Sequence, residues 1–270
     1  MIGTSLAEAL VQSVALSHLV KGHRRTSLLM LAAPESGKTT ITSSANAKHV
    51  ERVAVISGRS VLRAVNGTEA TEFLLFNDLS AIRAMSAPAV NLLVTILNQL
   101  TQDERGIVAF AGKEVEEIKR PVGIIGCIPF QTFTDHRARW KELGFISRMI
   151  PFAYRYDAEL VAEIKDSIDA GAHPAKVKAS KRMPKGSRQV AVTMNETLTK
   201  ELRRIADAKA VTLGQLGIRL LQNYHVLVRA HALLHGRRAV TREDLNFIRQ
   251  VNHYVSVTEC QPLGVNSVTV

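Results

Sequence analysis

Residues 28–41, LLMLAAPESGKTTI, are the stretch that decides the fold. An apolar run ends in the loop Ala-Pro-Glu-Ser-Gly-Lys-Thr-Thr, and a segment of threonine, alanine and apolar residues follows. This is the strand–loop–helix order of a phosphate-binding loop, in which backbone N–H groups without partners face one anion. The alternative is an ordinary surface turn, because Gly-Lys-Thr alone is a common tripeptide.

The loop predicts ATP and Mg²⁺ as ligands. Lys38 supplies a positive charge for the β- and γ-phosphates, and Thr39 supplies a hydroxyl for Mg²⁺. The first position of the full motif is Ala32 instead of glycine, so the match consists of Gly-Lys-Thr and its context. The residues predicted to hold the nucleotide are Ala33, Pro34, Glu35, Ser36, Gly37, Lys38, Thr39 and Thr40.

The composition bounds the class of protein. The chain has 270 residues, 46% of them hydrophobic, and no apolar run approaches the roughly 20 residues of a membrane span, so we expect no membrane partner. The two cysteines, Cys127 and Cys260, form no metal-binding pattern and favour a reducing cytoplasmic or nucleoid-associated location. The net charge of +11 favours a nucleic-acid partner, unless the charge is spread evenly over the surface.

Strands and helices alternate in the first part of the chain. Apolar runs predict strands at 27–32, 52–57, 73–76, 121–128 and 150–156, and helices are expected at 5–20, 38–48, 60–65, 88–102 and 135–143. A β-hairpin is expected within 106–118. Such alternation predicts an α/β domain over 1–157, with a parallel five-stranded sheet flanked by helices.

The second part differs in composition. Residues 158–195 read as a linker or exposed loop that becomes strongly basic, and only helical segments follow, at 197–209, 212–235 and 241–254. Thr241 with Asp244 three residues later is a helix-start signature. We therefore predict a smaller all-α lid over 196–255 and a tail over 256–270.

An acidic residue follows the apolar run at 73–76. Nucleotide hydrolysis needs a carboxylate to hold Mg²⁺ or to activate water, and an acid ending a strand beside the loop strand fills these roles. The sequence FLLFND supplies Asn77 and Asp78 instead of the usual Asp-Glu pair. Either Asp78 lies on the metal side and the base is elsewhere, or Asp78 is the base and Asn77 a weakened metal-side partner. The predicted metal ligands are Thr39, Asn77 and Asp78.

Taken in order, six segments resemble an AAA+ ATPase over nearly the whole chain. They are Ala32 to Thr40, FLLFND, SAIRAMSAPAVNLLVTILNQL, GIIGCIP, GFISRMIPF and RAHALLHGRRAVTREDL, of which AHALLHGRRAVTREDL most resembles the lid of MoxR-type ATPases and minichromosome-maintenance helicases. The resemblance implies an ATP hydrolase acting on DNA, as a helicase-like motor or a replication or recombination factor. It also implies an ATP site between subunits of a homo-oligomer, either a hexameric ring or a spiral.

The resemblance gives roles to two arginines. Arg148, in Ile-Ser-Arg-Met, matches the arginine finger that reaches a neighbouring subunit's γ-phosphate, and Arg219 matches the sensor-2 arginine that touches the nucleotide from the lid. Arg229 fits the second role less well, and ordinary solvated arginines remain the alternative. His23, Arg24 and Arg25 are expected near the base or phosphates.

Three positions depart from the family pattern. The strand ending in Ile128 lacks the polar sensor-1 residue, for which Gln131 or Thr132 would substitute, and Ala32 and Asn77 are also altered. Slow hydrolysis or a nucleotide switch therefore stays open. The alternative function is a nucleotide-responsive assembly or loader protein, or a MoxR-like ATPase that remodels a protein partner.

Basic residues outside the nucleotide loop suggest contacts with nucleic acid. The expected phosphate-contacting residues are Lys113 in the hairpin and Lys176, Lys178, Lys181, Arg182, Lys185 and Arg188 in the basic segment. The glutamates around Lys113 oppose this role, and a solvated linker is the alternative for the basic segment. Because no aromatic residues interleave the basic ones, we expect no base stacking there.

Overall fold

A sheet of six parallel strands forms the centre of the molecule. The computed structural model describes residues 4–54, 56–102, 106–109, 115–170 and 188–263. The strand order is β2-β3-β6-β1-β7-β8, and all the pairings are parallel. The strands are β1 (Ser27–Ala32), β2 (Val50–Arg52), β3 (Phe73–Phe76), β6 (Gly123–Pro129), β7 (Met149–Tyr156) and β8 (Gln261–Leu263).

The structure confirms a parallel α/β sheet and corrects two strands. The strand predicted at 52–57 is displaced to Val50–Arg52, where β2 pairs with β3 at the sheet edge. The side chains of β2 are exposed or half-buried, so this strand lacks the apolar run by which a buried strand is recognised in a sequence. The sixth strand, β8, comes from the tail, for which no regular structure was predicted, and pairs with Tyr154–Tyr156 of β7.

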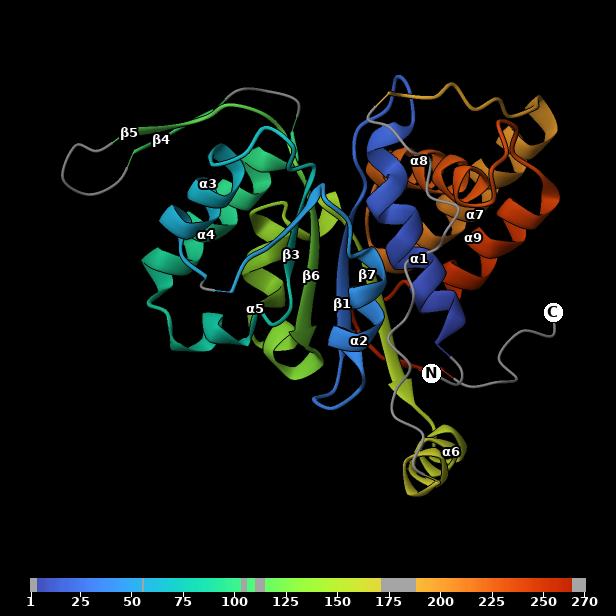
Figure 1. Cartoon of the computed structure of the whole chain (residues 1–270), viewed down its shortest axis with the longest axis horizontal. Helices are drawn as coiled ribbons and strands as arrows, with labels where there is room; N and C mark the ends of the chain where they lie inside the picture. Colours follow the sequence, from blue (N-terminus) through green and yellow to red (C-terminus); the bar gives the residue numbers. More distant parts are fainter. Residues whose placement is uncertain (1–3, 55, 103–105, 110–114, 171–187, 264–270) are drawn as a thin grey trace.

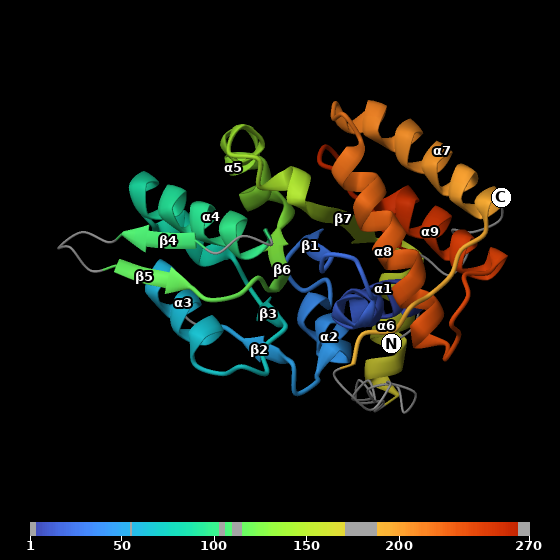
Figure 2. The same cartoon turned by 90° about the horizontal axis from the view of Figure 1, so that it is seen from above.

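Successive residues of the strands face opposite sides of the sheet, and each side has its own core. In β1, Leu28 and Met30 belong to one hydrophobic cluster, whereas Leu29 and Leu31 belong to the other. Helices α3 (Gly58–Asn66), α4 (Ala87–Leu100) and α5 (Phe130–Glu142) cover the second face. Both faces are therefore covered, as Figures 1 and 2 show, and this explains the uniform burial of β1 and β3.

The first face is covered by helices from both ends of the chain. Helix α1 (Ser5–Leu16) packs on α8 (Ile218–Leu234), and α7 (Glu196–Leu213) and α9 (Arg242–Tyr254) pack around α8. The buried residues of these helices form one continuous cluster with Leu28, Phe152 and Tyr154 of the sheet. The C-terminal helices thus share a core with the sheet. Thr241 and Asp244 form the expected capping box of α9.

The remaining elements are short or lie at the periphery. Residues 158–169, predicted as part of a linker, form α6 (Ala158–Asp169), which extends past the carboxyl end of β7 (Figure 1). The predicted hairpin is present as the antiparallel pair β4 (Gly106–Ala109) and β5 (Val115–Ile118). The other elements are α2 (Lys38–Thr42) and the 3₁₀ helices Ser17–Leu19, Ser43–Ala45, Ser80–Ala84 and Ile146–Arg148. Within the described residues, each helix is too short or too polar to cross a lipid bilayer.

Candidate functional site

A cavity of about 920 Å³ lies at the carboxyl ends of β1, β3 and β6, the lower edge of the sheet in Figure 1. Open parallel sheets bind ligands at such a place. The connections that follow two neighbouring strands here lead in opposite directions, which leaves a crevice at the carboxyl ends of the strands. The lining residues are Ala33, Pro34, Glu35, Ser36, Gly37, Lys38, Thr39, Asn77, Asp78, Ser80, Arg83, Pro129, Phe130, Gln131, Thr132, Arg155 and Cys260. They include every predicted nucleotide and metal residue except Thr40.

The loop after β1 is a tight turn held by internal hydrogen bonds. Gly37 has a φ of 70° and Glu35 a φ of 62°, both in the left-handed region that only glycine adopts without cost. The Ser36 hydroxyl donates to the Ala33 carbonyl over 2.6 Å, and the Tyr154 hydroxyl of β7 donates to the Ser36 carbonyl over 2.9 Å. Burial raises the pKa of Tyr154, so its phenol stays a neutral donor. The loop is therefore anchored to a strand of the sheet.

Lys38 lies folded back over this loop. Its Nζ donates to the Ala32 carbonyl over 3.1 Å and to Ser36 Oγ over 3.2 Å, and it also contacts the Ala33 carbonyl. Desolvation lowers the pKa of Lys38, while the negative charge of Asp78 acts in the opposite direction. A phosphate entering the cavity would draw this ammonium group away from neutral carbonyls, which are weaker partners than an anion.

The helix that follows the loop is shorter than predicted. Helix α2 ends at Thr42 and continues as a 3₁₀ turn to Ala45, whereas the sequence predicted a helix to 48. The Thr42 and Ser43 hydroxyls donate to carbonyls three or four residues earlier, a bonding mode that competes with regular helix. The contribution of a helix dipole is therefore small, and within the loop the amides and Lys38 are the groups that could bind an anion.

Asn77 and Asp78 follow β3 and reach the same cavity. The expectation that their strand lies beside the loop strand is wrong, because β6 stands between β3 and β1. The two carboxylate oxygens of Asp78 accept from the N–H and the hydroxyl of Ser80, each over 2.8 Å. Asn77 Oδ1 is buried and has no hydrogen-bond partner among the described residues. A buried oxygen of this kind has an unmet need for a donor or a cation.

These oxygens fit a Mg²⁺ ion. Thr39, Asn77 and Asp78 offer a hydroxyl, an amide oxygen and a carboxylate around one cavity, and Mg²⁺ prefers oxygen ligands supplied by one or two carboxylates together with phosphates. No cluster of three or more histidine, cysteine, aspartate or glutamate side chains suited to a metal occurs within the described residues. A Mg²⁺ ion here would therefore depend on phosphate oxygens for part of its coordination.

The first turn of α5, directly after β6, brings to the cavity a polar residue that the end of β6 lacks. Ile128 is fully buried, but Gln131 in the first turn of α5 lines the cavity. Its Nε2 donates to Asp135 Oδ1 over 2.9 Å, and Asp135 also pairs with Arg83 over 3.1 Å. Gln131 is therefore held at the cavity by Asp135 of its own helix, which Arg83 holds in turn.

Sequence reasoning missed two cations of this cavity, Arg83 and Arg155. Arg155 is exposed near the carboxyl end of β7, which pairs with β1. Its place late in the predicted strand 150–156 was a usable signal, because the carboxyl ends of parallel strands share one edge. Arg83 lies in a 3₁₀ turn that the sequence pattern did not mark.

Arg148 and Arg219 lie at the opposite edge of the sheet from this cavity. Helix α5 begins beside the cavity and runs for 13 residues, so its far end lies about 20 Å away, before Arg148 and β7. Arg148 Nη1 donates to the Gly144 carbonyl over 2.6 Å, and Arg219 Nη1 donates to Ser147 Oγ over 2.8 Å. Neither arginine lines the loop cavity of its own chain.

The amino-terminal edge also holds the basic residues before β1. His23, Arg24 and Arg25 were expected beside the nucleotide, but they line a separate cavity together with Arg148 and Arg219. The expectation is wrong because these residues precede β1, whereas the loop follows it. Basic residues that the sequence assigned to one nucleotide are thus divided between two edges of the sheet.

One of the residues expected to contact nucleic acid falls within the described residues. Arg188 is exposed in the segment that leads to α7 and is next to Gln189, which lines the cavity at the amino-terminal edge. The other predicted phosphate-contacting residues, Lys113, Lys176, Lys178, Lys181, Arg182 and Lys185, lie outside the described residues.

Comparison of the sequence with models of known protein families gives no match. Comparison with curated proteins gives none either. Of the two cavities in the described part of the chain, the loop cavity is the one that the sequence motif had indicated.

Proposed function

We propose that this protein binds ATP with Mg²⁺ in the cavity around Lys38 and hydrolyses the nucleotide slowly. The observation that supports this most is the convergence of the Lys38 loop with Asn77 and Asp78 at the carboxyl edge of the sheet. In this proposal the loop amides and Lys38 bind the phosphates, and Thr39 and Asn77 hold Mg²⁺, which compensates phosphate charge when it is bound. The volume of about 920 Å³ is within the range of small-ligand sites.

Three features support slow turnover. Both carboxylate oxygens of Asp78 are engaged by Ser80, so activation of water would require Asp78 to exchange partners. Asn77 carries no charge where a carboxylate would bind Mg²⁺ more strongly. Ile128 is apolar, which leaves Gln131 or Thr132 as the residue available to orient an attacking water.

The positions of Arg148 and Arg219 favour a site shared between copies. Because both lie at the edge opposite their own loop, they would act on the nucleotide of a neighbouring copy in a ring or spiral. This agrees with the AAA+ resemblance, in which α7–α9 would be the lid. The net charge of +11 favours DNA as the polymer on which such an assembly acts, as a motor or a replication or recombination factor.

Equilibrium binding of ATP to the Lys38→Ala variant tests the site. The Lys200→Ala variant is the matched control, because it removes an exposed lysine of α7 outside the cavity. We expect Lys38→Ala to weaken ATP binding by at least tenfold, since a bond to a charged group contributes about 1.5–3 kcal/mol. The control should bind as the wild type does. Equal affinity in all three proteins would place ATP elsewhere.

A nucleotide-responsive assembly protein is the second candidate, and the engagement of Asp78 by Ser80 favours it. ATP would then set the oligomeric state and the contact with a protein target, with little turnover. Sedimentation with and without ATP, together with ATP turnover with and without DNA, separates the two functions. Turnover stimulated by DNA supports the first function. Assembly driven by ATP without turnover supports the second.

A further inference from the structure

A second cavity, of about 420 Å³, lies at the amino-terminal edge of the sheet. Segments distant in sequence form it: the turn before β1, the end of α4, the 3₁₀ helix before β7, and the first turns of α8. The residues that line it are Gly22, His23, Arg24, Arg25, Thr101, Gln102, Arg148, Gln189, Arg219, Gln222, Asn223 and Val226. Among these described residues four carry side-chain amides, four are arginines, and none is acidic.

Two of the arginines are held close together. Gly144 has a φ of 71°, and a Cβ placed on it would lie 2.6 Å from Arg148 Nη1 and 4.0 Å from Arg219 Nη1. Both guanidinium groups thus lie within 4.0 Å of one point. Burial lowers the pKa of Arg148, and the charge of Arg219 lowers it further. Two like charges this close favour an anion between or beside them.

Arg148 also has an unmet hydrogen-bonding need. Its Nε is buried and has no partner within the described part of the chain, while its Nη1 donates to the Gly144 carbonyl. Arg219, in contrast, is exposed at the start of α8 and donates to Ser147 Oγ. The arginine pair is therefore fixed by neutral oxygens, and no described carboxylate pairs with either residue.

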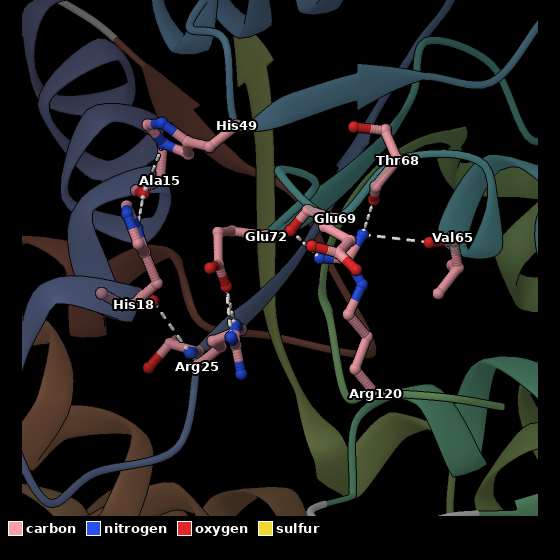
Figure 3. Close-up of polar contacts among 11 residues, drawn as sticks. Ala15, His18, Arg25, His49, Val65, Thr68, Glu69, Glu72 and Arg120 are labelled. Carbon is pink, nitrogen blue, oxygen red and sulfur yellow. Dashed lines mark hydrogen bonds and ion pairs between the residues drawn. The ribbon is translucent and has the colours of Figure 1, made fainter. Parts of the chain in front are cut away.

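Arg25 has a different role in the wall of this cavity. Figure 3 shows its guanidinium directed at Glu72, with which it forms an ion pair. Arg120, on the other side of Glu72, is directed instead at the carbonyls of Val65, Thr68 and Glu69. Glu72 neutralises Arg25, and Arg24 has an interaction of its own, so the two arginines that are held close together, Arg148 and Arg219, are the ones on which a ligand site would centre.

We propose that this cavity is a second anion site, built within a single chain, that binds the phosphate groups of a free oligophosphate or a small phosphorylated ligand. Arg148 and Arg219 would bind the phosphates, and the amides of Gln222 and Asn223 would supply further donors. The site does not depend on the nucleotide loop. A ligand here would, however, withhold Arg148 from the nucleotide of a neighbouring copy, so occupancy would lower turnover in an assembly.

Inorganic tripolyphosphate is the probe, titrated calorimetrically at low ionic strength. The protein carries Lys38→Ala, which removes the competing loop site. Into this background we introduce Arg219→Gln or Arg148→Gln; Arg219 is exposed, so its substitution does not endanger folding. The matched control is Arg204→Gln, which removes an exposed arginine of α7 that does not line the cavity.

We expect one site per chain, with affinity about tenfold lower in each of the Arg148 and Arg219 variants and unchanged in the control. Absence of binding, or equal affinity in all variants, would overturn the site. Sedimentation of the same samples separates two sources of phosphate. Binding by monomers supports a site for free ligands, whereas binding only by multimers would mean that phosphates are shared between copies and would overturn the proposal. A failure of the proposed ATP site would be seen in a different experiment: Lys38→Ala would then leave the affinity for ATP unchanged.

Discussion

Replacing Asn77 by aspartate tests which residue faces the metal. Asn77 Oδ1 is buried without a described partner, and Asp78 lies beside it with both oxygens bonded to Ser80. If Asn77 is the weakened metal-side ligand, a carboxylate in its place should bind Mg²⁺ more strongly. Interactions with charged groups contribute about twice as much as neutral ones, a difference of about 1–2 kcal/mol. The Mg²⁺ concentration for half-maximal ATP turnover should then fall roughly 5- to 30-fold.

The same substitution should carry a cost when no metal is bound. A buried carboxylate without a donor, placed beside the negative charge of Asp78, should lower the free energy of unfolding by about 2 kcal/mol. For a chain of this size that corresponds to a decrease in Tm of roughly 4–8 °C. Mg²⁺ with ATP should restore most of the decrease, because the ligands bind only the folded state.

Thermal melting and Mg²⁺ titration of turnover measure both effects. Asn66→Asp is the matched control, because Asn66 Oδ1 on α3 is also buried without a described partner but lies outside the cavity. The control should also be destabilised, and Mg²⁺ with ATP should stabilise it only as much as the wild type, so that its deficit relative to the wild type remains. An Asn77→Asp protein whose Mg²⁺ dependence equals that of the wild type would refute this role of Asn77. Asp78 would then be the metal-side residue.

Three further predictions concern catalysis, stability and pH. Arg148→Ala should leave ATP binding within twofold of wild type and reduce turnover by at least tenfold in the assembled protein, as measured by phosphate release; unchanged turnover would remove the arginine from the mechanism. Asp244→Ala should lower the free energy of unfolding by about 3–5 kcal/mol in a urea titration, because the buried carboxylate accepts hydrogen bonds from His231 and Arg237. The control Glu243→Ala removes an exposed carboxylate and should change the free energy of unfolding by less than about 1 kcal/mol. Burial, with a smaller contribution from His49, lowers the pKa of His18 to about 4, so the unfolded chain binds the proton between pH 6.5 and 4 and the folded chain does not. Stability should therefore be complete above about pH 6.5 and fall as the pH decreases through this window, and His18→Gln should reduce the slope; an unchanged slope would show that His18 does not titrate in this way.

Sequence patterns identified elements whose burial follows from their own composition. β1 and β3 are apolar runs buried on both faces, and both lie where the runs predicted. The edge strand β2 and the three-residue β8, which contains Pro262, carry no such pattern, because their strand conformation comes from pairing with β3 and β7. Local sequence therefore misplaced the first and missed the second.

The loop cavity was largely predictable because its residues follow predicted parallel strands. Lys38, Asp78 and Gln131 each come soon after a strand, and the carboxyl ends of parallel strands share one edge. The second cavity was not predictable, because Arg25, Arg148 and Arg219 come from three segments that only the packing of α8 against the sheet edge brings together.

The central claim is that a triphosphate lies on the loop amides and Lys38. The most direct measurement is a structure determined with Mg²⁺ and a non-hydrolysable ATP analogue. We expect the β- and γ-phosphates to contact Lys38 Nζ, displaced from the Ala32 carbonyl, with the metal beside Thr39 and Asn77. An analogue bound elsewhere, with Lys38 still donating to that carbonyl, would contradict the claim.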